Sequence, residues 1–122
     1  VGTFLGLVGG TLGKLSMDVK LMMQTEVAEV FEPYHHGRGS SSTMPQKSNP
    51  ITSELILAAA RSNASLLSSL HHAQIQEHER ATHGWQVEWL TLPEMLMLTG
   101  GALSNRKLTQ VCPIGPSRQN DR

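Results

Sequence analysis

The chain has 122 residues, one cysteine, and ten basic residues balanced by ten acidic ones. A net charge of zero provides no basic field for nucleic acid, and a single cysteine excludes a disulfide within the chain. The first thirteen residues are apolar, but Lys14 and Asp18 follow too early for a membrane span, and no basic region precedes them as in a signal peptide. We therefore expect a cytoplasmic protein that binds neither nucleic acid nor a membrane.

Apolar residues at steps of three and four predict one long helix that ends near Pro33. They are Phe4, Val8, Leu12, Leu15, Val19, Met22, Val27 and Val30. Five glycines occur among the first thirteen residues, and each weakens an isolated helix by up to about 1 kcal/mol relative to alanine. We expect that a neighbouring backbone approaches this helix closely and compensates for the loss.

Residues 34–50 have no such periodicity and are rich in glycine, serine, proline and asparagine, which predicts a loop. The loop ends at Asn49 and Pro50, which we interpret as an N-cap followed by proline at the first helical position. A second helix is predicted to run from there to about Ile75, with Glu54 near its positive end.

A third helical segment is predicted from Glu77 to Leu103, with a kink or a break near Leu92 because Pro93 follows. Trp85 and Trp89 lie one turn apart and share a face. The apolar stripe is lost in residues 105–122, where we expect an irregular or disordered tail. The fold class is therefore all-α, a bundle of long helices.

The segment SSTMPQKSNP within the loop indicates chemistry. Lys47 supplies a positive charge, Asn49 an amide donor, and the helix starting at Pro50 supplies free backbone N–H groups. Together these predict a site for a carboxylate or a phosphate. A serine beside such a site could act as a base, because the positive cluster stabilises its alkoxide. An ordinary serine-rich turn without function is the alternative from the residues alone.

This segment resembles the signature loop of the fumarase/aspartase superfamily, which reads G-S-S-x-M-P-x-K-x-N-P. Every position after the glycine matches, and Ser40 replaces the glycine. The resemblance covers residues 1 to about 104. It implies part of the central helical domain of an all-α enzyme, with its signature loop at residues 37–50. It also implies a homotetramer built around a central bundle of long helices.

The resemblance implies roles at the matched positions. Ser41, the first serine of the motif, would be the general base next to a substrate carboxylate. Ser40 and Ser42 are alternative bases. Because three serines are consecutive, only the number of residues before the motif lysine identifies which of them aligns with the catalytic serine of the family. Lys47 and Asn49 would bind the substrate carboxylates and stabilise the aci-carboxylate intermediate.

Further substrate-binding candidates are Ser42, Thr43 and Met44 in the loop, and Arg80. For Arg80, a structural ion pair with a glutamate is an equal alternative. We expect no cofactor. We also expect no metal, since His78 and His83 lie five residues apart and do not match the H-E-x-x-H zinc spacing.

The segment QEHERATHGWQVEWLTLPEM looks most like the carboxymuconate cycloisomerase branch. Adenylosuccinate lyases carry a serine and an arginine for the nucleotide phosphate where Trp85 and Trp89 stand here, so a nucleotide substrate is disfavoured. We expect an enzyme of aromatic catabolism that acts on a small di- or tricarboxylate, most like 3-carboxy-cis,cis-muconate cycloisomerase. One alternative is a C–N lyase that releases fumarate from a substituted aspartate. Another is an inactive helical structural fragment.

Family members also need a histidine-bearing region and residues from neighbouring chains. We therefore expect the isolated chain to be inactive.

Overall fold

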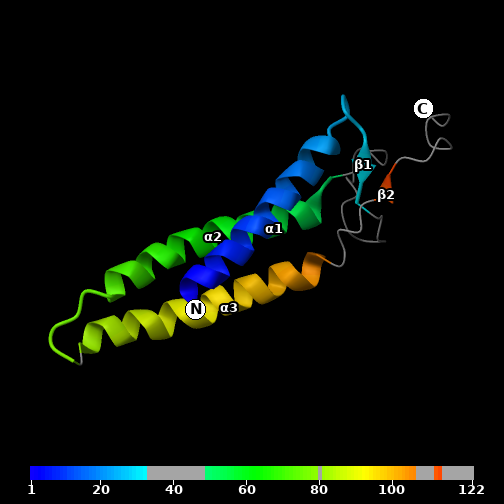
Figure 1. Ribbon diagram of the computed structural model, residues 1–122. Coiled ribbons are helices and arrows are strands. Elements are labelled where there is room, and N and C mark those ends of the chain that lie inside the picture. Colours follow the sequence, from blue (N-terminus) through cyan, green and yellow to red (C-terminus); the bar gives the residue numbers. More distant parts are fainter. Residues whose placement is uncertain (33–48, 80, 107–111, 114–122) are drawn as a thin grey trace.

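The computed structural model describes residues 1–32, 49–79, 81–106 and 112–113. In chain order these form α1 (Gly2–Met22), β1 (Val30–Phe31), α2 (Ile51–Ala73), α3 (Thr82–Arg106) and β2 (Cys112–Pro113). Figure 1 shows α2 and α3 as a long hairpin, with α1 packed along it and the two strands near the start of α2. The predicted all-α class is confirmed, and the described residues add one antiparallel pair of two-residue strands.

The glycines of α1 line its contact with α2. A β-carbon added at Gly13 would lie 2.9 Å from the β-carbon of Ala60, which no side-chain rotation can move away. Successive glycines toward the N-terminus meet residues farther along α2, so the two helices run antiparallel. The pairs are Gly13 with Ala60, Gly9 with Asn63, Gly6 with Leu67 and Gly2 with Leu70. The expected close approach is confirmed on this face, whereas no described atom lies within 4 Å of a β-carbon added at Gly10.

A small core lies where the three helices meet. Leu12 of α1, Ile56 of α2 and Ala102 of α3 are buried together, and Val8 and Ala59 pack against them. The three side chains come from three separate elements, so burying them fixes how the helices associate.

The apolar stripe predicted for the first helix is only partly buried. Leu12 and Val19 are buried, but Phe4 is 66% exposed and Leu15 is 54% exposed. The reason is that the glycine face makes the contact with α2, which turns these two apolar side chains outward.

α1 ends at Met22, well before the predicted end near Pro33. Ala28 has a φ of 49°, which a helix does not tolerate, and the N–H of Glu29 donates to the carbonyl of Met22 at 3.0 Å. Val30 then begins β1, which pairs with β2 at the other end of the chain. The predicted continuation is wrong because the helical spacing of the apolar residues carries no information about that distant partner.

α3 is one continuous helix that contains Pro93, so of the predicted kink or break the break is wrong, and the kink stays a prediction. Thr91, Met95 and Thr99 flank the proline at steps of four and are all buried. Packing of this face against the other helices offsets the hydrogen bond that proline cannot make. The helix also runs to Arg106, past the predicted start of the tail.

Candidate functional site

Most of the residues predicted to act on a substrate lie outside the described residues: Ser40, Ser41, Ser42, Thr43, Met44, Lys47 and Arg80. Asn49 is described, and it is half-buried just before α2. The described residues therefore include the two ends of the predicted loop, at Glu32 and Asn49. The contacts of these residues are therefore the part of the predicted site that the structure describes.

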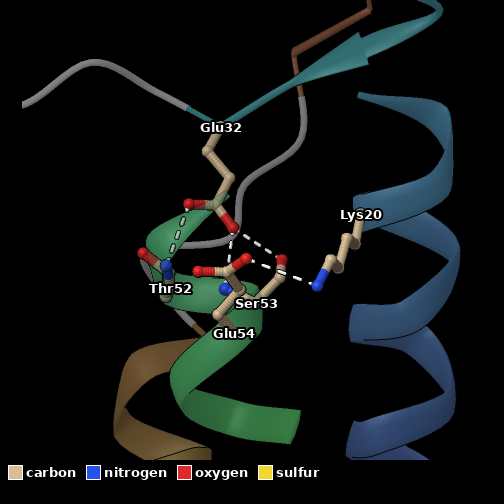
Figure 2. A network of polar contacts seen from close by, with 5 residues as sticks. All are labelled: Lys20, Glu32, Thr52, Ser53 and Glu54. Atoms are coloured by element: carbon tan, nitrogen blue, oxygen red, sulfur yellow. Dashed lines mark hydrogen bonds and ion pairs between the residues drawn. The ribbon is translucent and has the colours of Figure 1, made fainter. Parts of the chain in front are cut away.

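The start of α2 is held by Glu32, a residue that the sequence did not single out (Figure 2). One carboxylate oxygen, Oε2, accepts the backbone N–H of Thr52 at 3.1 Å. The other, Oε1, accepts the backbone N–H of Ser53 at 2.8 Å and the Ser53 hydroxyl at 2.6 Å. Ser53 is 0% exposed, so its hydroxyl depends on a protein acceptor. The positive end of the helix dipole adds to the attraction for a carboxylate.

The first-turn N–H groups of α2 all have acceptors within the chain. The N–H of Ile51 donates to the carbonyl of Asn49, and the N–H of Glu54 donates to the carbonyl of Pro50, both at 2.9 Å. Those of Thr52 and Ser53 donate to Glu32. The prediction that this helix start offers free N–H groups to a substrate anion is therefore wrong. A carboxylate of the protein itself already occupies that position.

The predicted N-cap is displaced by one residue. Helix α2 has Pro50 as its N-cap residue, with no side-chain cap hydrogen bond, and begins at Ile51. Glu32 supplies the acceptor that a side chain at the N-cap position supplies in other helices. Capping patterns are read over a few neighbouring residues, so an acceptor twenty residues upstream leaves no local signal.

A second contact ties the same turn to α1. The ammonium of Lys20 lies 3.3 Å from Oε1 of Glu54, and the two side chains are 44% and 52% exposed. Solvent screens an ion pair this exposed, so it contributes little to stability. Figure 2 shows that Lys20 and Glu32 approach the first turn of α2 from different elements.

The position of Arg80 in the chain separates it from the loop. Its described neighbours, Glu79 and Ala81, belong to the connection between α2 and α3, at the opposite end of α2 from Asn49 (Figure 1). A helix of 23 residues is about 35 Å long. Within one chain, the described neighbours of Arg80 are therefore separated from Asn49 by the length of α2.

The Trp85–Trp89 pair is confirmed as one face of α3. The rings stack with centroids 6.3 Å apart and an interplanar angle of 29°, and they are 46% and 70% exposed. Other large apolar side chains are also exposed on α1 and α3. They are Phe4, Leu7, Leu15 and Leu21 on α1, and Leu90, Leu96, Met97 and Leu103 on α3. Among the described residues these two helices therefore present wide apolar surfaces.

Within the described ranges, no three His, Cys, Asp or Glu side chains are placed to share a metal ion. None of the helices described here combines the length and the apolar character needed to cross a bilayer.

Comparison with known proteins gives relatives for this arrangement. A family model described as a lyase matches residues 2–62, which include α1, the loop and the start of α2. The chain is 52% identical over 103 residues to the 3-carboxy-cis,cis-muconate cycloisomerase of Acinetobacter baylyi, covering 84% of this chain and 23% of that protein. It is also 52% identical over 105 residues to trans-aconitate decarboxylase 1 of Mycosarcoma maydis, covering 86% of this chain and 21% of that protein.

A solved structure shares the fold. The crystal structure of the 3-carboxy-cis,cis-muconate lactonizing enzyme from Pseudomonas putida matches with a TM-score of 0.78 and 47% identity. The match covers 88% of this chain and 24% of that one. The chain thus spans less than a quarter of the length of the curated relatives reported above.

Proposed function

We propose a function from the premise that this chain belongs to the lyase family, within the fumarase/aspartase superfamily. In the whole protein, the segment contributes the signature loop to a cycloisomerase site that acts on 3-carboxy-cis,cis-muconate. The observation that carries this proposal is that two of the matched relatives are named for this substrate, the Acinetobacter baylyi cycloisomerase at 52% identity and the Pseudomonas putida lactonizing enzyme at 47%. Residues 1–104 form part of the central helical domain, with the loop at 37–50, and α3 continues this domain to Arg106.

The proposed reaction closes a lactone ring. A carboxylate oxygen of the muconate adds to one carbon of a double bond, and the electron pair moves to the neighbouring carbon, which bears a carboxyl group. The resulting carbanion is stabilised as an aci-carboxylate and takes a proton from the Ser41 hydroxyl. In the reverse direction the Ser41 alkoxide removes that proton. The carbon acid is weak, so electrostatic stabilisation of the intermediate carries most of the catalysis.

Side chains of the loop bind the substrate carboxylates in this proposal. The first-turn N–H groups of α2 are already bonded within the chain, so Lys47 and Asn49 are the anion-binding groups at this end of the loop. Ser42, Thr43 and Met44 complete the contact with the substrate. No cofactor takes part in the step.

The active protein is proposed to be a homotetramer. The exposed apolar side chains of α1 and α3 support burial against further chains. The distance of about 35 Å along α2 supports a site that takes Asn49 and Arg80 from different copies. The catabolic role and the single cysteine are compatible with the cytoplasm.

To test this proposal, the whole protein is mixed with 3-carboxy-cis,cis-muconate and the ultraviolet absorbance of the substrate is followed. We expect loss of the muconate absorbance, and we expect Ser41→Ala to lower kcat by a factor of about a thousand or more, because it removes the group that transfers the proton. The 122-residue chain alone is expected to show no turnover. Equal activity of Ser41→Ala and the unsubstituted protein would contradict the role of the serine.

Trans-aconitate and substituted aspartates belong in the same substrate panel. The decarboxylase relative is as similar to this chain as the cycloisomerase is, so identity does not separate the two chemistries. Consumption of trans-aconitate with release of carbon dioxide would assign the protein to that relative's chemistry. Fumarate formed from a substituted aspartate would assign it to the C–N lyases instead. A folded whole protein that is silent on every substrate would favour an inactive structural role.

A further inference from the structure

We propose that Glu32 is a positioning residue for this reaction. Its carboxylate holds the first turn of α2, and through that turn it fixes the backbone of Asn49. This inference rests on the proposed function for its catalytic consequence. The hydrogen bonds that it invokes lie wholly within the described residues.

A single carboxylate joins the two ends of the loop. Glu32 directly follows β1 and precedes the loop, whereas Thr52 and Ser53 lie just beyond its end. Three donors converge on the two oxygens, at 3.1, 2.8 and 2.6 Å. Hydrogen bonds to an ionised acceptor are stronger than neutral ones, and using both oxygens fixes the direction of the carboxylate as well as its distance.

The position of Glu32 is itself fixed by structure on its other side. Phe31, the preceding residue, belongs to β1 and pairs with Cys112 of β2. The β1 strand also contacts α1. The carboxylate is therefore attached to a paired strand and is not carried by an unsupported segment.

The restraint passes to Asn49 through the backbone. The N–H of Ile51 donates to the carbonyl of Asn49 at 2.9 Å, and the N–H of Glu54 donates to the carbonyl of Pro50 at 2.9 Å. These bonds belong to the same turn that Glu32 holds through Thr52 and Ser53. Release of that turn would therefore shift Asn49, and misplacing a substrate-binding group by about 1 Å can cost about a hundredfold in rate.

Glu32 also decides which anion occupies the start of α2. A helix N-terminus with free N–H groups attracts carboxylates. The substrate class proposed here carries several carboxylates, and one of them bound at Thr52 and Ser53 would lie in an unproductive place. With Glu32 present this position is filled, so a substrate carboxylate does not bind there.

The first experiment measures amide hydrogen exchange at Thr52 and Ser53 in the whole protein. Glu32→Gln keeps the size of the side chain but removes its charge and one acceptor oxygen. Glu29→Gln is the matched control, because Glu29 is an exposed glutamate three residues earlier. We expect exchange at Thr52 or Ser53 to be about tenfold faster in Glu32→Gln and unchanged in Glu29→Gln.

The second experiment measures kcat and KM in the same variants and in Glu32→Ala. We expect Glu32→Ala to lower kcat by about 10- to 100-fold, with a smaller change in KM, and Glu32→Gln to fall between it and the unsubstituted protein. Added formate fits the space left in Glu32→Ala and supplies the missing acceptor, so it should restore part of kcat. It should have no effect on Glu29→Gln.

The outcomes separate this inference from the proposed function. Faster exchange at Thr52 or Ser53 in Glu32→Gln, in a protein that is silent on every substrate, would defeat the proposed function and contradict the catalytic role of Glu32 with it. The structural role of Glu32 as the cap of α2 would still hold. Turnover that stays within twofold in both Glu32 variants would overturn the inference and leave the function intact. Failure of formate to raise kcat of Glu32→Ala would show that an anion at the helix start is not what positions the site.

Discussion

The contact between α1 and α2 and the base of the loop are held by different means. Along the helix contact, small residues on α1 meet Ala60, Asn63, Leu67 and Leu70 over most of the helix length. At the loop base, one side chain, Glu32, accepts three hydrogen bonds from the first turn of α2. The first region depends on shape at many points, whereas the second depends on the direction and charge of a single carboxylate.

This difference predicts where stability and activity can be separated. Dispersion contacts and apolar burial along the helices add over many residues, so each strong perturbation there lowers the stability of the whole bundle. The bonds of Glu32 restrain a short backbone segment, so their loss should change activity more than it changes stability. Four substitutions test this division, in decreasing order of expected effect.

Ile56→Ala should destabilise the bundle most. Ile56 is 2% exposed and lies in the cluster where the three helices meet. We expect the free energy of unfolding of the 122-residue chain to fall by about 3 kcal/mol, measured by urea denaturation. Ile56→Val should cost about 1 kcal/mol, because it removes one methylene. A loss for Ile56→Ala no larger than that for Ile56→Val would show that this cluster does not organise the bundle.

Gly13→Leu should be the next most damaging change, because the new β-carbon would meet that of Ala60 at 2.9 Å. We expect a loss of about 2 to 3 kcal/mol in the free energy of unfolding. The matched control is Gly10→Ala, where no described atom lies within 4 Å, and it should stabilise α1 by about 1 kcal/mol. Destabilisation by Gly10→Ala equal to that by Gly13→Leu would contradict a contact confined to one face.

Glu32→Ala should lower the free energy of unfolding by about 1 to 2 kcal/mol, the usual range for loss of a helix cap. The exposed Glu29→Ala should stay within about 0.5 kcal/mol. Urea denaturation of both variants gives the comparison. A loss of unfolding free energy for Glu32→Ala as large as that for Ile56→Ala would contradict the separation of stability from activity, because Glu32 would then stabilise the fold as much as a core residue does.

Lys20→Ala should have the smallest effect, because its ion pair with Glu54 is about half exposed on both sides. We expect a change of less than about 0.5 kcal/mol in the free energy of unfolding at low salt, and none at 1 M salt. A larger change that persists at high salt would mean that Lys20 acts together with Glu32 in holding the first turn.

Much of the helical fold could be predicted from the sequence. The long periodic segments correspond to α1, α2 and α3, and the glycines indicated the close approach of a neighbour before the neighbour was known. Periodicity failed where a partner far along the chain decides the conformation. The apolar spacing at Val27 and Val30 predicted a longer helix, but α1 ends at Met22, and the chain then turns at Ala28 and enters β1.

The candidate site divides in the same way. The signature segment identified the family from ten neighbouring residues, and the roles of Ser41, Lys47 and Asn49 stay predictions. Arg80 stays a prediction as well, and the length of α2 separates its described neighbours from Asn49. Distance through space between elements is not encoded in a motif.

By itself the sequence determined the helices, the glycine face and the family, because each depends on residues that are close together along the chain. Tertiary structure decided that α1 ends at Met22, that Pro93 lies within a continuous helix, and that Glu32 fills the positive end of α2. The physical reason is that a backbone N–H donates to any suitably placed acceptor, and only the folded chain brings a carboxylate from twenty residues away into reach.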